Sequence, residues 1–174
     1  SYFSTNKYHR GPGWYRRQLP VRLDRKKRVF EKTPEYIFCP EVPGRIRESL
    51  GPDRKFILIL RNPVERAWSA WNHYRKYYHS WNGYTKEALV ERIRTNMGEE
   101  RGGPMLAFLE KPSYPDFEEC IGEEIGLIQK GVFQYDPSFV RRGIYHEQIA
   151  NFREHFDREN LLILESGEFR DRKR

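Results

Sequence analysis

A single apolar run, Ile57-Leu58-Ile59-Leu60, constrains the fold more than any other part of this 174-residue chain. The run is continuous rather than alternating, and the turn residues Gly51-Pro52-Asp53 precede it. A run of this kind predicts a strand over residues 55–60 that is covered on both faces, as strands of a parallel sheet are. The chain is therefore expected to bury this strand between layers of other structure.

The residues that follow this strand predict an immediate helix start. Asn62 is a favourable N-cap residue, Pro63 suits the first helical position, and Glu65 is placed to complete a capping box. We expect the helix to run to about Tyr77. A strand, a sharp turn and a helix N-terminus thus meet at Arg61.

The rest of the chain carries further strand and helix signals. Gly11-Pro12-Gly13 marks a turn, and Pro34 restricts Thr33 to an extended conformation. Helices are predicted over residues 14–20, 40–50, 86–96, 105–109, 117–125 and 137–156, the last interrupted at Gly143, and strands over 28–31 and 160–164. This order of elements predicts an α/β fold with a mainly parallel sheet.

The composition of the chain indicates a folded domain and limits the kinds of partner it could bind. Aromatic residues make up 15% of the sequence, which argues against a disordered tail, and the length suits one domain. The formal net charge of +7 serves solubility or favours an anionic partner, such as nucleic acid, a phosphorylated cofactor, an acidic polysaccharide or a membrane surface. No apolar run approaches the roughly 20 residues of a membrane-spanning helix. Cys39 and Cys120 make no metal-site spacing or disulfide framework, so they either pair or are both free, and no metal site is expected.

The junction at Arg61 has the features of a phosphate site. A helix N-terminus at the carboxyl end of a buried strand offers backbone N–H groups and the positive end of the helix dipole. The Arg61 guanidinium suits bidentate contact with a phosphate, and Ser69 follows about two turns later with a hydroxyl donor. The alternative is that Arg61 pairs with an acidic neighbour and that Ser69 is a small packing residue.

The sequence Arg61-Asn62-Pro63-Val64-Glu65-Arg66-Ala67-x-Ser69 resembles the 3′-phosphate-binding motif of sulfotransferases that use 3′-phosphoadenosine 5′-phosphosulfate (PAPS). The strongest resemblance is to sulfotransferase domains that act on heparan sulfate and related glycans. Four other segments agree in order and approximate spacing: Tyr2–Tyr15, Glu31–Tyr36, Arg142–Gln148 and Leu161–Phe169. Five motifs in the same order are far more specific than any one of them.

The resemblance implies roles for the residues at matching positions. Arg61 and Ser69 would hold the 3′-phosphate of PAPS, and Lys32 would stabilise charge at the transferring sulfuryl group. His73, one helical turn after Ser69, would face the acceptor as a second catalytic residue; the alternative is a surface histidine.

Five further residues receive roles by resemblance, each with a plain alternative. Arg142 and Tyr145 would help to shape the cofactor site, or else serve as a surface arginine and a packing tyrosine. Lys7, His9 and Arg10 would contact an anionic acceptor, or else form a solvated basic loop.

The resemblance also implies a fold and an activity. The fold would be a P-loop-NTPase-like three-layer α/β domain, with a central mainly parallel sheet flanked by helices, over residues 1–174 and incomplete at both ends. The family's 5′-phosphosulfate loop and its general base are expected before Ser1, and the cofactor-covering loop after Phe169. PAPS would donate a sulfuryl group to a glycan hydroxyl or amine, leaving PAP, in the Golgi lumen or, alternatively, in a bacterial cytoplasm.

Two other functions fit parts of the sequence. A P-loop kinase shares the general fold but requires a Gly-x-x-x-x-Gly-Lys-Ser/Thr motif, which the sequence does not contain. A nucleic-acid-binding module would explain the basic and aromatic residues of 1–28 and 71–81, but it leaves the strand leading into Arg61 unexplained. We therefore expect no nucleic acid partner.

Overall fold

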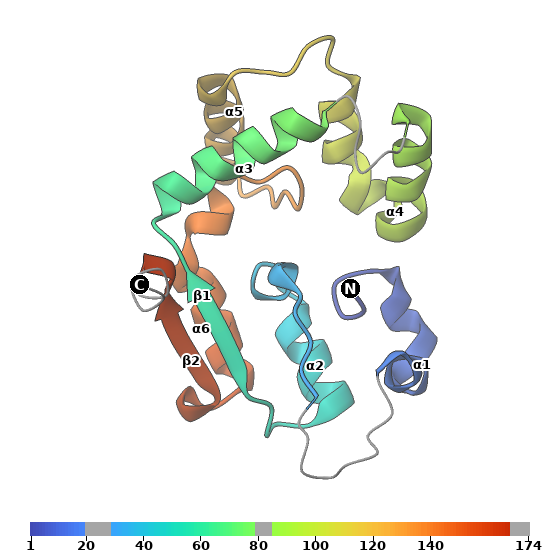
Figure 1. The fold of residues 1–174 in the computed structure, drawn as a ribbon, viewed down its shortest axis with the longest axis vertical. Coiled ribbons are helices and arrows are strands. Elements are labelled where there is room, and N and C mark those ends of the chain that lie inside the picture. Colours follow the sequence, from blue (N-terminus) through green and yellow to red (C-terminus); the bar gives the residue numbers. More distant parts are fainter. Residues whose placement is uncertain (20–28, 79–84, 168–174) are drawn as a thin grey trace. The chain divides into compact units, whose positions relative to one another are not determined.

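The computed structural model describes residues 1–19, 29–78 and 85–167 of the chain. The fold is α/β, with strands β1 and β2 paired in a two-stranded parallel sheet (Figure 1). In chain order the longer elements are α1 Gly11–Gln18, α2 Val42–Leu50, β1 Phe56–Leu60, α3 Pro63–Tyr77, α4 Lys86–Glu110, α5 Phe117–Gln129, α6 Tyr145–His155 and β2 Leu161–Glu165. Short 3-10 helices are η1 Asn6–Arg10, η2 Pro34–Ile37, η3 Arg141–Gly143 and η4 Arg158–Asn160.

The chain forms two compact units. The first consists of Ser1–Phe56 with Gln148–Leu161, and the second of Ile57–Glu147 with Leu162–Arg174. Within the described residues, no helix is both long enough and apolar enough to span a membrane.

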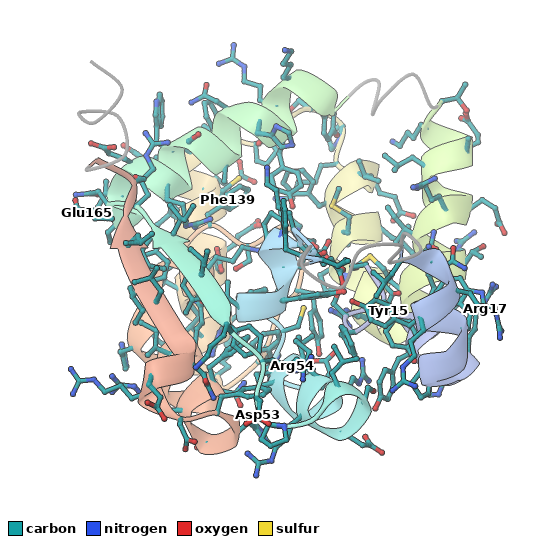
Figure 2. The ribbon with its side chains drawn as sticks, turned by 60° about the horizontal axis from the view of Figure 1, so that its bottom comes forward. Tyr15, Arg17, Asp53, Arg54, Phe139 and Glu165 are labelled. Atoms are coloured by element: carbon teal, nitrogen blue, oxygen red, sulfur yellow. The ribbon has the colours of Figure 1, made fainter. Side chains whose placement is uncertain are left out.

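Aromatic side chains form the interior of the first unit. Tyr2 stacks on Tyr15 of α1 with ring centroids 4.8 Å apart, and Phe3 meets both rings. A second group joins Phe56 at the start of β1 to Phe152 and Phe156. Figure 2 labels Tyr15 on α1, together with the exposed Arg17 of the same helix. Burial of these rings removes apolar surface from water and so stabilises this unit.

The hydrophobic core of the second unit packs against α3. Trp71 lies at the centre of a buried cluster and donates its indole N–H to the carbonyl of Pro115 at 3.1 Å. Helices α4 and α5 and the loop around Phe139 supply the rest of this cluster: Leu89, Ile93, Met105, Phe108, Leu109, Cys120 and Phe139. These contacts anchor the middle of α3 on α4, α5 and the loop around Phe139.

The predicted start and end of α3 are confirmed. The Oδ1 atom of Asn62 accepts hydrogen bonds from the backbone N–H groups of Val64 at 3.0 Å and Glu65 at 3.2 Å. Pro63 occupies the first turn, and the helix ends at Tyr77 as expected. Only half of the predicted capping box forms, because the Glu65 carboxylate accepts from the Nε atom of Arg61 instead.

The expectation that the first strand is covered on both faces is wrong for this chain. Leu58 is 8% exposed, but its neighbours Ile57 and Ile59 are 65% and 58% exposed. Alternate residues of a strand point to opposite faces, so one face of β1 is buried and the other is open. Leu162 and Ile163 of β2 are exposed as well.

Three other boundaries differ from the predictions for local reasons. Helix α1 begins at Gly11 rather than Trp14, because Gly11, at φ +78°, ends η1 and Pro12 fits the first turn of α1. Residues 29–31 form no strand, and Phe30 is 89% exposed; Arg28 lies outside the described residues. Residues 137–140 form a loop rather than the start of a long helix.

Helix α4 confirms one predicted helix and extends another. The predicted helix over residues 86–96 is present, and Gly98, at φ +75°, breaks the helical path after it. The chain then continues as helix to Glu110, so the predicted helix over 105–109 begins several residues earlier than expected and includes Pro104. Pro104 has no N–H group for an intrahelical hydrogen bond, so the helix continues past a position that lacks one such bond.

The Asn62 cap allows a direct test of the α3 start. Asn62→Ala should lower the free energy of unfolding by about 1 kcal/mol, because two backbone donors lose their acceptor. Asn72→Ala is the matched control, since Asn72 is exposed on the same helix and, within the described part of the chain, its side chain bonds only to the carbonyl of Trp68. Urea denaturation of both variants measures the difference, and equal destabilisation would contradict the capping role.

Candidate functional site

Arg61 lies where β1 ends and α3 begins. Its Nε atom donates to Oε2 of Glu65 at 3.1 Å, in a pair with both side chains substantially exposed. The terminal amino groups of its guanidinium make no hydrogen bond to the part of the chain that the structure describes. The predicted alternative, pairing with an acidic neighbour, therefore occurs through one edge of the guanidinium. The other edge is open to an anion.

The backbone at the start of α3 contributes less to an anion site than expected. Asn62 accepts the N–H groups of Val64 and Glu65 through its side chain, and that of Arg66 through its carbonyl at 2.9 Å. Pro63 has no N–H group. The first-turn donors are thus satisfied within the protein. An anion here would be bound by side chains and by the positive end of the helix dipole.

Ser69 and His73 line one face of α3 with Glu65. Residues four apart on a helix are neighbours, so Glu65, Ser69 and His73 form a row. Both Ser69 and His73 are exposed. The alternative of Ser69 as a packing residue is not supported by this exposure. The Arg61 side chain contacts Glu65, the first member of this row.

The segment from Phe139 to Tyr145 contacts the junction of β1 and α3. The Tyr145 hydroxyl donates to the backbone carbonyl of Arg61 at 2.9 Å. Gly143 packs so closely on Pro63 that an added Cβ would lie 2.9 Å from the proline Cβ. Arg66 donates a hydrogen bond to the carbonyl of Phe139, which Figure 2 labels. We call residues 138–143 the support loop.

Arg142 and Tyr145 therefore occupy different settings. Tyr145 touches the backbone of Arg61, whereas the Arg142 guanidinium forms an ion pair with Asp136 at 3.0 Å and contacts the carbonyl of Tyr135. The ion pair holds Arg142 within its own loop.

Glu124 is a residue that the sequence did not single out. Its carboxylate is 3% exposed and accepts four hydrogen bonds, from the Ser138 hydroxyl and from the backbone N–H groups of residues 139, 140 and 141, at 2.7, 2.5, 2.8 and 3.1 Å. A carboxylate has about four acceptor positions, so this group is saturated. No local pattern predicts it, because the four donors lie 14–17 residues further along the chain.

Lys32 belongs to the first unit, at an exposed position outside the helices and strands. Its neighbour Glu31 accepts hydrogen bonds from the hydroxyls of Tyr15 at 2.5 Å, Tyr36 at 2.6 Å and Thr33 at 2.8 Å. Burial, and then the bond to Glu31, raises the pKa of both tyrosines well above the usual value, so both remain donors at neutral pH. Glu31 thus secures the backbone that carries Lys32.

Lys7, His9 and Arg10 lie together on η1 of the same unit. His9 and Arg10 are exposed, and Lys7 is partly buried. The Arg10 guanidinium lies over the Trp14 ring, 5.1 Å from its centroid, a cation–π arrangement that leaves the charge accessible. Three basic side chains on one short helix can attract an anion.

The two cysteines are buried, and the described residues contain no metal-binding cluster. Cys39 and Cys120 are free and buried, and burial raises the pKa of the Cys120 thiol to about 11. Cys120 is therefore a neutral thiol near pH 7. Over residues 1–19, 29–78 and 85–167, no group of three or more His, Cys, Asp or Glu side chains is placed to hold a metal ion.

Comparisons with known proteins agree with these motifs. The chain is 40% identical over 167 residues, 96% of its length, to heparan sulfate glucosamine 3-O-sulfotransferase 3B1 of Homo sapiens, of which this covers 33%. It is 44% identical over 66 residues, 38% of its length, to heparan sulfate glucosamine 3-O-sulfotransferase 6 of Homo sapiens, and this covers 19% of that protein. A segment of 77 residues, 44% of the chain, is 39% identical to the bifunctional heparan sulfate N-deacetylase/N-sulfotransferase 3 of Homo sapiens, 9% of which it covers. No protein-family profile matches.

Over 96% of its length the chain is therefore similar to heparan sulfate sulfotransferases, which supports a place in the sulfotransferase family close to these members. It spans a third or less of the length of the curated relatives it matches.

The pair between Arg61 and Glu65 gives a prediction about the energetics of the site. Glu65→Gln should change the free energy of unfolding by less than about 0.5 kcal/mol, because exposed ion pairs contribute little. The same variant should bind a multivalent anion such as PAP a few-fold more tightly, since a negative charge beside Arg61 is removed. Calorimetric titration and urea denaturation test the two statements. Weaker PAP binding by the variant would contradict the second statement, and a larger change in the free energy of unfolding would contradict the first.

Proposed function

We propose that this chain is part of a PAPS-dependent sulfotransferase that transfers a sulfuryl group to a hydroxyl or amine of a heparan-sulfate-type glycan. The observation that carries the proposal is the open edge of the Arg61 guanidinium at the junction of β1 and α3. The names of the relatives support the transfer to a glycan. They do not favour the kinase-like alternative.

Arg61 and Ser69 would hold the 3′-phosphate of the cofactor. Both side chains reach solvent on one side of α3, and the residues present fit a phosphate: a guanidinium fork, a hydroxyl donor and the positive end of a helix dipole. Because the backbone N–H groups of the first turn are already paired, most of the affinity for the 3′-phosphate would come from Arg61. Tyr145 would shape the cofactor site through its hydrogen bond to the Arg61 carbonyl, and Arg142 through the loop that its ion pair with Asp136 holds.

The remaining site residues would act on the acceptor and on charge in the transition state. When bound, PAPS supplies the activated sulfuryl group. Lys32 would stabilise negative charge that develops during transfer, and His73 would face the acceptor. Lys7, His9 and Arg10 would contact acidic groups of the glycan.

The finer description of the fold belongs to the same proposal. The exposed apolar side chains of β1 and β2, among them Ile57, Ile59 and Leu162, support a sheet that is one layer of a P-loop-NTPase-like three-layer domain. Residues 1–174 would be part of that single domain. A Golgi lumenal location is proposed because the enzyme would meet its glycan acceptor there.

The role of Arg61 predicts a loss of affinity that depends on the 3′-phosphate. In the full-length protein, Arg61→Ala should weaken PAP binding about 10- to 100-fold, the usual contribution of a charge-assisted contact. The same variant should bind 5′-AMP, which lacks the 3′-phosphate, within about twofold of the parent. Calorimetric titration with both nucleotides measures the two affinities.

Arg54→Ala is the matched control for this experiment. Arg54 is exposed in the turn before β1, where Figure 2 labels it beside Asp53, and it carries the same charge. Its replacement should leave PAP binding unchanged. Equal losses in the two variants would mean that general positive charge, rather than a clamp at Arg61, attracts the nucleotide.

The role of Lys32 predicts a separation of binding from turnover. Lys32→Ala in the full-length enzyme should lower kcat about 100- to 1000-fold, the range seen when one electrostatic stabiliser is removed. PAP affinity should change little. Lys130→Ala, at an exposed lysine directly after α5, serves as the control. Transfer of labelled sulfate from PAPS to desulfated heparan sulfate is the assay, and full turnover by Lys32→Ala would reject the assignment.

A further inference from the structure

We propose that Glu124 is a positioning residue for the 3′-phosphate clamp, the pair Arg61 and Ser69. It would act through the support loop at residues 138–143. This inference rests on the proposed function, because it concerns the same clamp at Arg61. Glu124, the support loop and α3 all belong to the second unit of the chain.

The first step of the argument is the environment of the carboxylate. Glu124 points from α5 into the protein and is 3% exposed, so its charge has lost most of its contact with water. Such a group is stable only when its acceptor positions are filled. Here Oε1 accepts from Ser138 and Arg141, and Oε2 accepts from Phe139 and Val140.

The second step is what these four bonds fix. Three of the donors are consecutive backbone N–H groups, at residues 139, 140 and 141, so the carboxylate determines the course of the main chain there. Arg66 of α3 holds the same loop from another direction, because its guanidinium donates to the carbonyl of Phe139. The main chain of the support loop is therefore hydrogen-bonded both to the Glu124 carboxylate of α5 and to the Arg66 guanidinium of α3.

The third step connects the loop to the clamp. Directly after the residues that make these hydrogen bonds, Gly143 packs on Pro63, and Tyr145 donates to the carbonyl of Arg61 at 2.9 Å. These two contacts bear on the residue that would bind the phosphate and on the first residue of α3. A shift of the loop would move the Arg61 backbone relative to Ser69, and two-point binding of a phosphate depends on that spacing.

Glu124→Gln is the informative variant because it keeps the size of the side chain. The amide nitrogen can only donate, so at least one backbone N–H of the loop would face another donor. Glu123→Gln is the matched control: Glu123 is the preceding residue of α5, is exposed, and pairs with Lys111 at 2.8 Å. Both variants remove one negative charge from the same helix.

The measured quantity is the ratio of the affinities of the full-length protein for PAP and for 5′-AMP, obtained by calorimetric titration. A lower folded fraction reduces both apparent affinities equally, so the ratio reports the 3′-phosphate contact and not stability. We expect the ratio to fall at least tenfold in Glu124→Gln and to stay within twofold of the parent in Glu123→Gln. A folded Glu124→Gln protein with the parent's ratio would overturn the inference.

A second variant decides the matter if Glu124→Gln does not fold. Gly143→Ala leaves the buried carboxylate in place but puts a methyl group 2.9 Å from the Cβ of Pro63. It should lower the ratio about tenfold, whereas Gly126→Ala, whose Cβ would meet nothing within 4 Å, should not. A parent protein with equal affinities for PAP and 5′-AMP would overturn the proposed function as well. Unchanged ratios in the folded variants of a discriminating parent would overturn the positioning role alone.

Discussion

The hydrogen bonds that Asn62 accepts at the start of α3 determine how the rest of the site is built. Its Oδ1 atom takes the N–H groups of Val64 and Glu65, and this cap turns the chain from strand to helix within two residues. The turn leaves Arg61 at the end of the strand with its side chain beside the first turn of α3. The same cap occupies the backbone donors of the first turn, so an anion at this junction would be bound by the Arg61 side chain rather than by the backbone.

Two buried or partly buried charges hold the support loop by its main chain. Glu124 accepts from its N–H groups, and Arg66, whose pKa is lowered by burial, donates to the carbonyl of Phe139. Neither contact depends on the loop's own side chains except at Ser138. Charges that are buried and paired with main-chain groups favour one loop conformation strongly, because any other conformation would leave a charge without partners.

Features that depend on residues close together in the sequence could be predicted, whereas features that depend on distant residues could not. The bounds of α3 were predictable because Asn62 and Pro63 act within one turn, and the family motif at Arg61 reads along the same turn. The open face of β1 was not, because a continuous apolar run states only that a strand is apolar and not what covers it. Glu124 was not predictable either, since its partners are backbone atoms 15–17 residues away and any residue type can supply those.

The one-sided contacts of Arg61 have a consequence for selectivity. Nε is occupied by Glu65, and the Arg61 carbonyl is occupied by Tyr145, so both the side chain and the backbone of this residue are restrained before any ligand arrives. Restraint of this kind reduces the entropy lost on binding. Glu65, Ser69 and His73 lie in a row along one face of α3, which leads from the end of β1 toward the later turns of the helix. A ligand that meets both Arg61 and Ser69 must lie along this face, and an isolated phosphate, which cannot extend beyond the clamp, would gain nothing from the turn that carries His73.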